Sequence, residues 1–143
     1  MKINRDIQTL LDKLIATALT KGVQPSELAD ALFEDDYCEL HIKKSNGIVC
    51  MDVIFSDYSE DGISTCTMRY SYNADKTLMR IEQKINRGKF KIQWDRSEDT
   101  ETIMKQLEIS LLDLNDNSEV RKWLNKLPNE LTGQLQKRLR LVA

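Results

Sequence analysis

The chain has 143 residues, of which 41% are hydrophobic and 31% charged, a composition typical of one folded domain with a hydrophobic core. Its 21 basic and 23 acidic side chains give a net charge of −2, which disfavours broad electrostatic binding of nucleic acid. The apolar runs are shorter than a membrane-spanning helix needs and no signal peptide is recognisable, so we expect a cytoplasmic protein without a membrane segment.

The N-terminal residues predict two helices. Apolar side chains recur at three- and four-residue steps over residues 2–21, and Gly22 follows where a helix commonly ends in a left-handed conformation. Pro25 fits the first turn of a second helix over residues 25–34. Acidic residues close this second helix, which is an unfavourable position beside the negative end of its dipole.

From residue 37 the apolar period changes to two, which predicts β-strands. Asn46-Gly47 is a strong signal for a two-residue hairpin loop, because both positions must accept a positive φ. Such a loop joins strands 37–45 and 48–57 and sets Ser45 opposite Ile48. The register then pairs apolar residues on one face of the sheet, namely Ile42 with Met51, Leu40 with Val53, and Cys38 with Phe55.

Three further strands are expected over residues 63–72, 77–86 and 89–95, because turn residues separate these alternating segments. Short hairpin connections make all five strands an antiparallel meander. The expected register sets Tyr70 opposite Met79, Met68 opposite Ile81, Ile85 opposite Phe90, and Ile81 opposite Trp94. In this register the rings of Phe90 and Trp94 point to the core.

Three helices follow, over residues 98–114, 118–127 and 129–141, with Ser97 as the expected N-cap of the first. Residues 1–143 thus predict a single α+β domain, a five-stranded antiparallel meander with two N-terminal and three C-terminal helices packed mainly on one face. The sequence leaves open whether the last helix packs on its own sheet or on a second copy of the chain.

The cysteines and the single histidine match no metal-binding motif. Cys38, Cys50 and Cys66 include no C-x-x-C pair, and His41 is the only histidine. Structural zinc sites need four such ligands at characteristic spacings. We therefore expect three reduced thiols, no metal site and no cofactor.

Functional side chains are expected on the sheet face that the helices leave open. The register puts His41 across from Asp52, with Cys50 as the diagonal neighbour of His41. A thiol, an imidazole and a carboxylate together would suit a cysteine-dependent enzyme. A flat sheet centre lacks the cleft and the oxyanion donors that such a nucleophile needs, so a solvent-facing His–Asp pair is the favoured interpretation.

Two segments suggest nucleic-acid binding as an alternative. Residues 18–29 loosely resemble the first half of a helix-turn-helix, but acidic residues at 34–36 stand where a recognition helix would meet phosphates. A basic strip from Lys84 to Lys91 lies near Trp94, and cations beside an aromatic ring suit a single strand. We favour a structural role for the lysines of this strip, which keep an edge strand from pairing with other chains.

No phosphate-binding loop, catalytic serine motif or zinc-protease motif is present, so the sequence favours a binding role over catalysis. The favoured hypothesis is a small non-enzymatic module of adaptor, inhibitor, immunity or secretion-chaperone type that binds another protein, with homodimerisation as an alternative. The residues expected to contact the partner carry charges suited to charge-assisted hydrogen bonds, and they are His41, Asp52, Arg69, Arg80 and Glu82.

Overall fold

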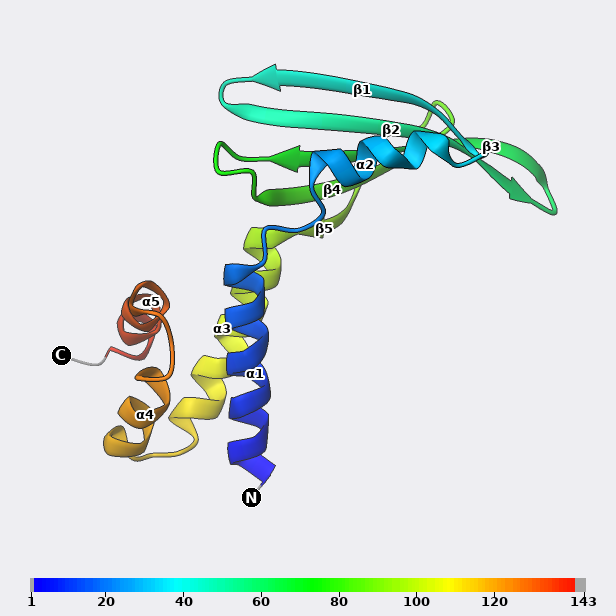
Figure 1. Ribbon diagram of the computed structural model, residues 1–143. Coiled ribbons are helices and arrows are strands. Elements are labelled where there is room, and N and C mark those ends of the chain that lie inside the picture. The colour runs from blue at the N-terminus through cyan, green and yellow to red at the C-terminus, as the bar shows by residue number, and fades with distance from the viewer. Residues whose placement is uncertain (1, 141–143) are drawn as a thin grey trace. The chain divides into compact units, whose positions relative to one another are not determined.

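The computed structural model describes residues 2–140 and has an α+β fold (Figure 1). Its strands form one antiparallel sheet, and helices precede and follow these strands in the sequence. The last residue of the helix expected over 129–141 lies outside the described residues. The elements are α1 Lys2–Leu19, α2 Pro25–Asp30, the 3-10 turn η1 Ala31–Phe33, β1 Tyr37–Ser45, β2 Ile48–Ser59, β3 Gly62–Tyr72, β4 Leu78–Ile85, β5 Lys91–Asp95, α3 Arg96–Leu112, α4 Asn117–Leu124 and α5 Asn129–Leu139.

The elements fall into two compact units. The sheet unit comprises Thr20–Ser97, and the helical unit comprises the residues on either side of it, Met1–Leu19 and Glu98–Ala143. Each unit has a hydrophobic cluster of its own among its described residues. No helix within residues 2–140 combines the length and the apolarity that crossing a membrane requires.

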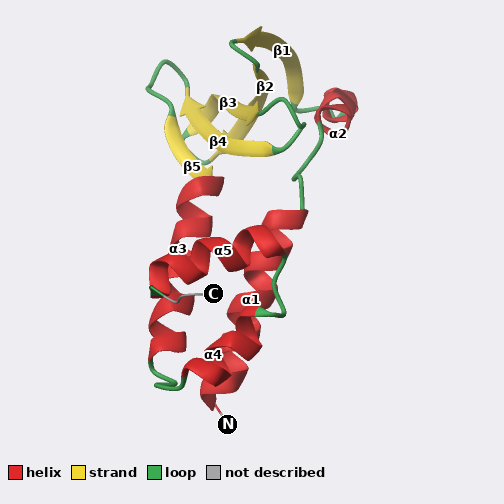
Figure 2. Cartoon of the chain, turned by 90° about the vertical axis from the view of Figure 1, so that its left-hand side faces the viewer, coloured by secondary structure: helices red, strands yellow, loops and turns green. Residues whose placement is uncertain are grey.

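The sheet has the strand order β1-β2-β3-β4-β5, so the expected meander is confirmed (Figure 2). Asn46 and Gly47 have φ values of 53° and 79°, and Ser45 lies opposite Ile48, as the two-residue loop requires. The predicted pairs Ile42–Met51 and Leu40–Val53 are also confirmed. The β1–β2 hairpin therefore follows from local turn chemistry.

Bulges change the register at three places. Between Tyr37 and Glu39 an extra residue sets Tyr37 opposite Phe55, so the predicted pairing of Cys38 with Phe55 is wrong. Cys38 is this extra residue, and its thiol lies 3.4 Å from the carbonyl oxygen of Ile54 as a donor. A strand alternation read from the sequence counts every residue and cannot show where one is inserted.

The second and third bulges displace β4 and β5. Tyr70 lies opposite Ile81 and Tyr72 opposite Leu78, so the predicted pairs of Tyr70 with Met79 and Met68 with Ile81 are wrong. The turn explains this shift, because the Asn73 side-chain oxygen accepts hydrogen bonds from the backbone N–H groups of Asp75 and Thr77, at 2.9 and 3.1 Å. The predicted Ile81–Trp94 pair is confirmed, whereas β5 begins only at Lys91 and its ladder includes no Ile85–Phe90 pair.

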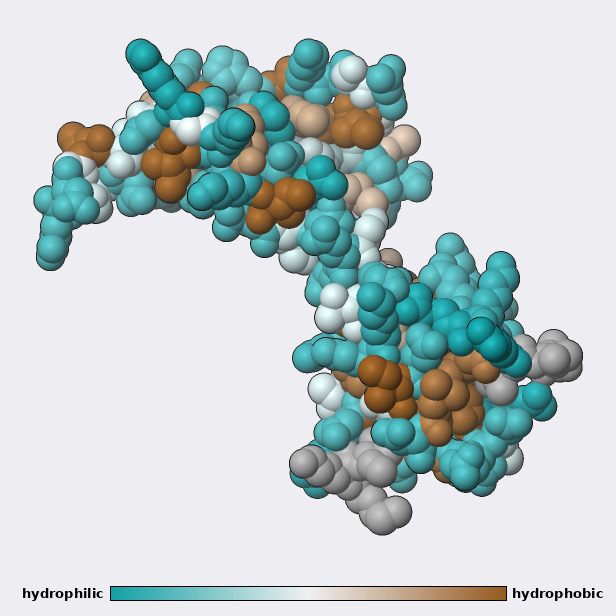
Figure 3. All heavy atoms as spheres, turned by 180° about the vertical axis from the view of Figure 1, so that it is seen from behind, coloured by the Kyte–Doolittle hydropathy of each residue, from teal (hydrophilic) through white to brown (hydrophobic). Residues whose placement is uncertain are grey.

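The sheet unit buries one sheet face. Its cluster of buried residues consists of Leu28, Met51, Val53, Tyr72 and Leu78. Leu28 comes from α2, which begins at Pro25 as expected but gives way to η1 at Ala31, so the helix is shorter than the predicted 25–34. On the face that Figure 3 shows, the sheet unit carries apolar side chains that stand singly among hydrophilic ones. We call the face of the sheet that carries Met51 and Val53 the inner face and the opposite one the outer face.

Residues between α1 and α2 are fixed against β3 and β4. The backbone N–H of Leu78 donates to the Lys21 carbonyl at 2.7 Å, and the Tyr72 hydroxyl donates to the Val23 carbonyl at 2.6 Å. Gly22 has the left-handed φ expected for it, 87°, although α1 already ends at Leu19. A Cβ at Gly22 would lie 2.8 Å from the Leu78 Cβ, so the close approach requires glycine.

The helical unit buries the apolar stripes of α1, α3, α4 and α5 against one another. Its fully enclosed side chains are Ile7, Leu11, Leu14, Leu107, Leu111 and Leu135. The prediction put the helices mainly on the sheet, but among the described residues only Leu28 of α2 belongs to the buried cluster of the sheet. An amphipathic stripe requires an apolar partner without specifying whether that partner is a sheet or another helix, which explains the difference.

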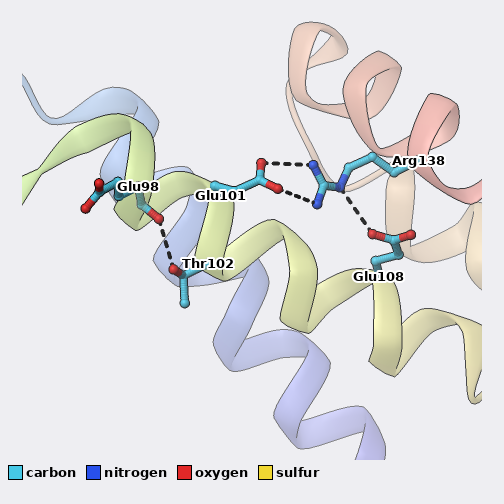
Figure 4. A network of polar contacts seen from close by, with 5 residues as sticks. All are labelled: Glu98, Glu101, Thr102, Glu108 and Arg138. Atoms are coloured by element: carbon cyan, nitrogen blue, oxygen red, sulfur yellow. Dashed lines mark hydrogen bonds and ion pairs between the residues drawn. The ribbon is translucent and has the colours of Figure 1, made fainter.

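Polar contacts add to this packing. The Arg138 guanidinium of α5 donates to both carboxylate oxygens of Glu101 in α3, at 3.0 and 2.9 Å, and to Glu108 at 3.3 Å (Figure 4). The Asp116 side chain caps α4 by accepting from Ser118 at 2.9 Å. The expected cap at Ser97 is wrong, because α3 begins one residue earlier, at Arg96.

Candidate functional site

The registers of the four strand pairs align side chains in rows across the outer face. The central row, one residue from each strand, consists of His41, Asp52, Arg69, Glu82 and Ile92. The neighbouring row consists of Lys43, Cys50, Ser71, Arg80 and Asp95. Four of the five residues predicted for partner binding therefore lie in one row, and Arg80 lies in the row beside it.

Asp52 and Arg69 form the centre of this face. Arg69 Nε and Nη2 donate to Oδ1 and Oδ2 of Asp52 at 2.8 and 2.9 Å, a parallel two-bond geometry. The side chains are 34% and 22% exposed, for Arg69 and Asp52 respectively, so the pair is neither buried nor fully solvated. The hydrogen bond to Asp52 raises the pKa of Arg69 above its ordinary value, against the opposing effect of partial burial.

The ring of Phe90 lies against Arg69 on the outer face. The guanidinium carbon of Arg69 is 3.9 Å from the ring centroid of Phe90, and Lys84 Nζ is 5.1 Å from it. The prediction that Phe90 points to the core is wrong. The loop from Asn86 to Phe90 precedes β5, so Phe90 is not bound by the strand alternation that turns Trp94 inward.

His41 does not pair with Asp52, although it stands directly opposite. Its Nε2 lies 3.5 Å from a carboxylate oxygen of Glu39, and both side chains are more than half exposed. Cys50 Sγ lies 3.6 Å from the Ser71 hydroxyl. The hydrogen-bonded chain of thiol, imidazole and carboxylate that the enzyme hypothesis requires is not assembled.

Arg80 is held by a residue that the sequence analysis did not single out. Its Nε donates to Oδ2 of Asp95 at 2.9 Å, and the Asp95 side chain is only 9% exposed. Asp95 is the last residue of β5, and the register brings it directly opposite Arg80. The signal was present in the sequence, because the predicted Ile81–Trp94 pair already sets Arg80 opposite Asp95, but the charge pair that follows from it was not drawn.

Two shallow hollows lie beside these rows, the first along the central row and the second along the neighbouring row. The first has a volume of about 550 Å³ and is lined by His41, Lys43, Ser45, Asn46, Ile48, Cys50, Asp52 and Arg69. The second, about 520 Å³, is lined by Ile48, Cys50, Ser71, Tyr72, Asn73, Met79, Arg80, Asp95 and Ser97. Because both include Ile48 and Cys50, a partner group resting there would meet an apolar and a thiol side chain between charged ones.

Within residues 2–140, no group of three His, Cys, Asp or Glu residues is placed to hold a metal ion. The nucleic-acid alternative through the first two helices loses its geometry, because α2 has six residues and continues into η1. No protein family model, curated protein or solved structure matches this chain. The side chains of the outer face therefore make up the candidate site.

Proposed function

We propose that this protein is a small non-enzymatic module that binds another protein through the outer face of its sheet. The proposal is carried by one observation, the central row in which Arg69 is held by both carboxylate oxygens of Asp52 and by the ring of Phe90. A side chain that is already fixed loses little rotamer entropy when a partner binds, and Arg beside an aromatic ring is a frequent interface anchor.

The surroundings of this anchor suit a partner of mixed charge. Glu82 stands opposite Arg69 on one side and can accept donors from a basic partner group, while Lys43 and Lys84 can meet acidic ones. Ile48 and Ile92 are each 49% exposed and supply apolar area next to the charges. Protein interfaces combine these elements, an apolar centre with charged and polar side chains around it.

The proposed role is that of an adaptor, inhibitor, immunity protein or secretion chaperone in the cytoplasm. These classes share the requirement for a stable folded surface without catalytic groups. The mild negative charge and three free thiols at Cys38, Cys50 and Cys66 support the cytoplasmic placement.

Affinity capture from the cells that produce the protein tests the proposal with matched variants. The face variant combines Glu82→Ala and Lys84→Ala, and the control combines Glu60→Ala and Arg87→Ala in two exposed turns, with the same change of charge. We expect one partner to be recovered with the wild type and the control, and at least tenfold less with the face variant. Equal recovery with both variants, or no partner with the wild type, contradicts the proposal.

Nucleic-acid binding is the second candidate function, and the outward position of Phe90 favours it. An aromatic ring next to Lys84 on an accessible face is the arrangement that stacks a base and neutralises a phosphate. Retention on single-stranded DNA or RNA that falls steeply with salt, and that is lost in Phe90→Ala, would support this function. Elution at low salt that Phe90→Ala leaves unchanged would exclude it.

A further inference from the structure

β1 is an end strand of the sheet, and one of its two main-chain edges has no neighbouring strand among the described elements. Most of its side chains are exposed, including Ile42 at 62%, although Ile42 belongs to the inner, apolar face. An open edge of this length is a template for pairing with another strand.

The β1–β2 hairpin decides which residues offer their main chain to a partner. Ser45 and Ile48 flank a two-residue loop, so they form a hydrogen-bonded pair, and such pairs recur at every second residue. Lys43, His41 and Glu39 therefore direct their N–H and C=O groups to β2. Leu40, Ile42 and Lys44 direct theirs to the open edge.

The exposed edge is complementary to itself. When two copies of β1 are set antiparallel about a twofold axis through His41, Leu40 of one copy stands opposite Ile42 of the other, and both direct their main chains to the new pair. Glu39 then stands opposite Lys43 of the second copy, in the closer type of pair without main-chain bonds. Each of these pairs occurs twice, so apolar residues meet on the inner face and opposite charges meet on the outer face.

Other registers lose this match. Moving the axis to Ile42 sets Leu40 opposite Lys44 of the second copy, and moving it to Leu40 sets Glu39 opposite His41. A shift by one residue sets a residue whose main-chain groups face β2 opposite a residue whose main-chain groups face the open edge. It also sets inner-face side chains of one copy opposite outer-face side chains of the other. Only the axis at His41 satisfies the charges, the apolar residues and the hydrogen bonds together.

The opposite edge of the sheet does not offer the same match. β5 carries Lys91 and Asp95 at its two ends, but the bulge in the β4–β5 ladder puts them on different faces, opposite Gln83 and Arg80. Asp95 is also engaged by Arg80. Self-pairing is thus a property of β1.

We propose that this protein forms a homodimer in which β1 pairs antiparallel with β1 of a second copy, with His41 on the twofold axis. The inference does not depend on the proposed function. The dimer joins the two sheets and sets the two central rows end to end. The contact comprises four main-chain hydrogen bonds, two Leu40–Ile42 pairs and two Glu39–Lys43 pairs. Because this is far smaller than a standard interface, a dissociation constant of about 10 μM to 1 mM is expected.

Sedimentation equilibrium of the full chain over a concentration series tests the dimer. Glu39→Lys or Lys43→Glu alone replaces two attractive pairs by two repulsive ones and should weaken dimerisation about tenfold or more. The double variant Glu39→Lys/Lys43→Glu restores opposite charges and should return to within about threefold of the wild type. An equimolar mixture of the two single variants should form the mixed dimer, since both of its charge pairs are attractive.

Lys44→Glu is the control, because it has the same charge change on β1 but stands on the inner face. It should affect dimerisation less than Lys43→Glu does. All of these positions are exposed, and circular dichroism verifies that each variant is folded. A wild type that stays monomeric at about 1 mM, or a dimer that the charge swap does not restore, overturns the proposal. Partner capture by the outer face is measured separately, so failure of one proposal is distinguishable from failure of the other.

Discussion

A double-mutant cycle on Asp52 and Arg69 tests whether the outer face is pre-organised. Asp52→Asn keeps the size of its side chain, and Arg69→Met removes the guanidinium together with its contact with the Phe90 ring, a loss that cancels in the cycle because both Arg69 variants share it. Exposed ion pairs couple by about 0.2–1 kcal/mol, whereas hydrogen bonds to charged groups away from water contribute about 1.5–3 kcal/mol each. With two bonds at 2.8 and 2.9 Å and side chains 34% and 22% exposed, we expect a coupling free energy of about 1.5 kcal/mol.

Tryptophan fluorescence during urea unfolding can follow the sheet unit alone. Trp94 lies in this unit and Trp123 in the helical one, so a Trp123→Phe background leaves Trp94 as the reporter for all four members of the cycle. The exposed pair Glu119–Lys122, whose nitrogen and oxygen are 3.3 Å apart, serves as a control in a Trp94→Phe background and should couple by no more than about 0.5 kcal/mol. A coupling as small for Asp52 and Arg69 would refute the reasoning, because the two side chains would then be no more fixed than a surface pair.

Three further predictions concern stability. Gly22→Ala should lower the free energy of unfolding by about 2 kcal/mol, because Gly22 has a φ of 87° and lies close to Leu78. Gly133→Ala in α5 meets no atom within 4 Å and should raise the free energy of unfolding by about 0.5 kcal/mol. Urea titrations that rank the two variants in the opposite order contradict the close approach at Gly22. Burial raises the pKa of Tyr72 to about 12, so the unfolded chain releases this proton first and stability should fall above about pH 10. Tyr72→Phe should remove this loss along with about 1 kcal/mol of hydrogen bonding to Val23, and urea titrations of both proteins below and above this pH check it. The hydrogen bond from Arg138 lowers the pKa of Glu101, so the unfolded chain takes up a proton at this residue before the folded chain does as the pH falls. The stabilisation from this bond is present above the ordinary pKa and is lost as the pH falls through the lowered pKa. Thermal unfolding followed by circular dichroism should show that Glu101→Gln loses less stability in acid than the wild type.

Local signals determined the parts of the fold that were predicted correctly. Asn46-Gly47 admits one loop length, and from that loop the alternation of β1 and β2 places His41 opposite Asp52. The same alternation was expected to put Arg69 of β3 on the outer face with Asp52, and the structure pairs the two residues across β2 and β3. Each step depends on neighbours a few residues apart, which a sequence displays directly.

The errors arose where one residue was inserted or where the partner was distant. Asn73 closes the β3–β4 turn with its side chain, which shifts β4 against β3, and the loop before Lys91 turns Phe90 outward. Neither feature changes the apolar pattern on which the prediction relied. The stripe of α1 shows that Leu14 is buried, but not that its partners include Leu107 and Leu135 rather than the sheet.

The composition of the helical unit has a consequence for biosynthesis. α1 is translated before the rest of its unit, and the side chains that share a buried cluster with Ile7, Leu11 and Leu14 belong to α3, α4 and α5, beyond residue 97. At about 5 to 20 residues per second, the roughly 80 residues in between take about 4 to 16 s to emerge from the ribosome. During this interval the apolar stripe of α1 is exposed on the nascent chain, while the sheet unit is synthesised in full. The N-terminal segment is thus the part of this protein for which a ribosome-associated chaperone would matter most.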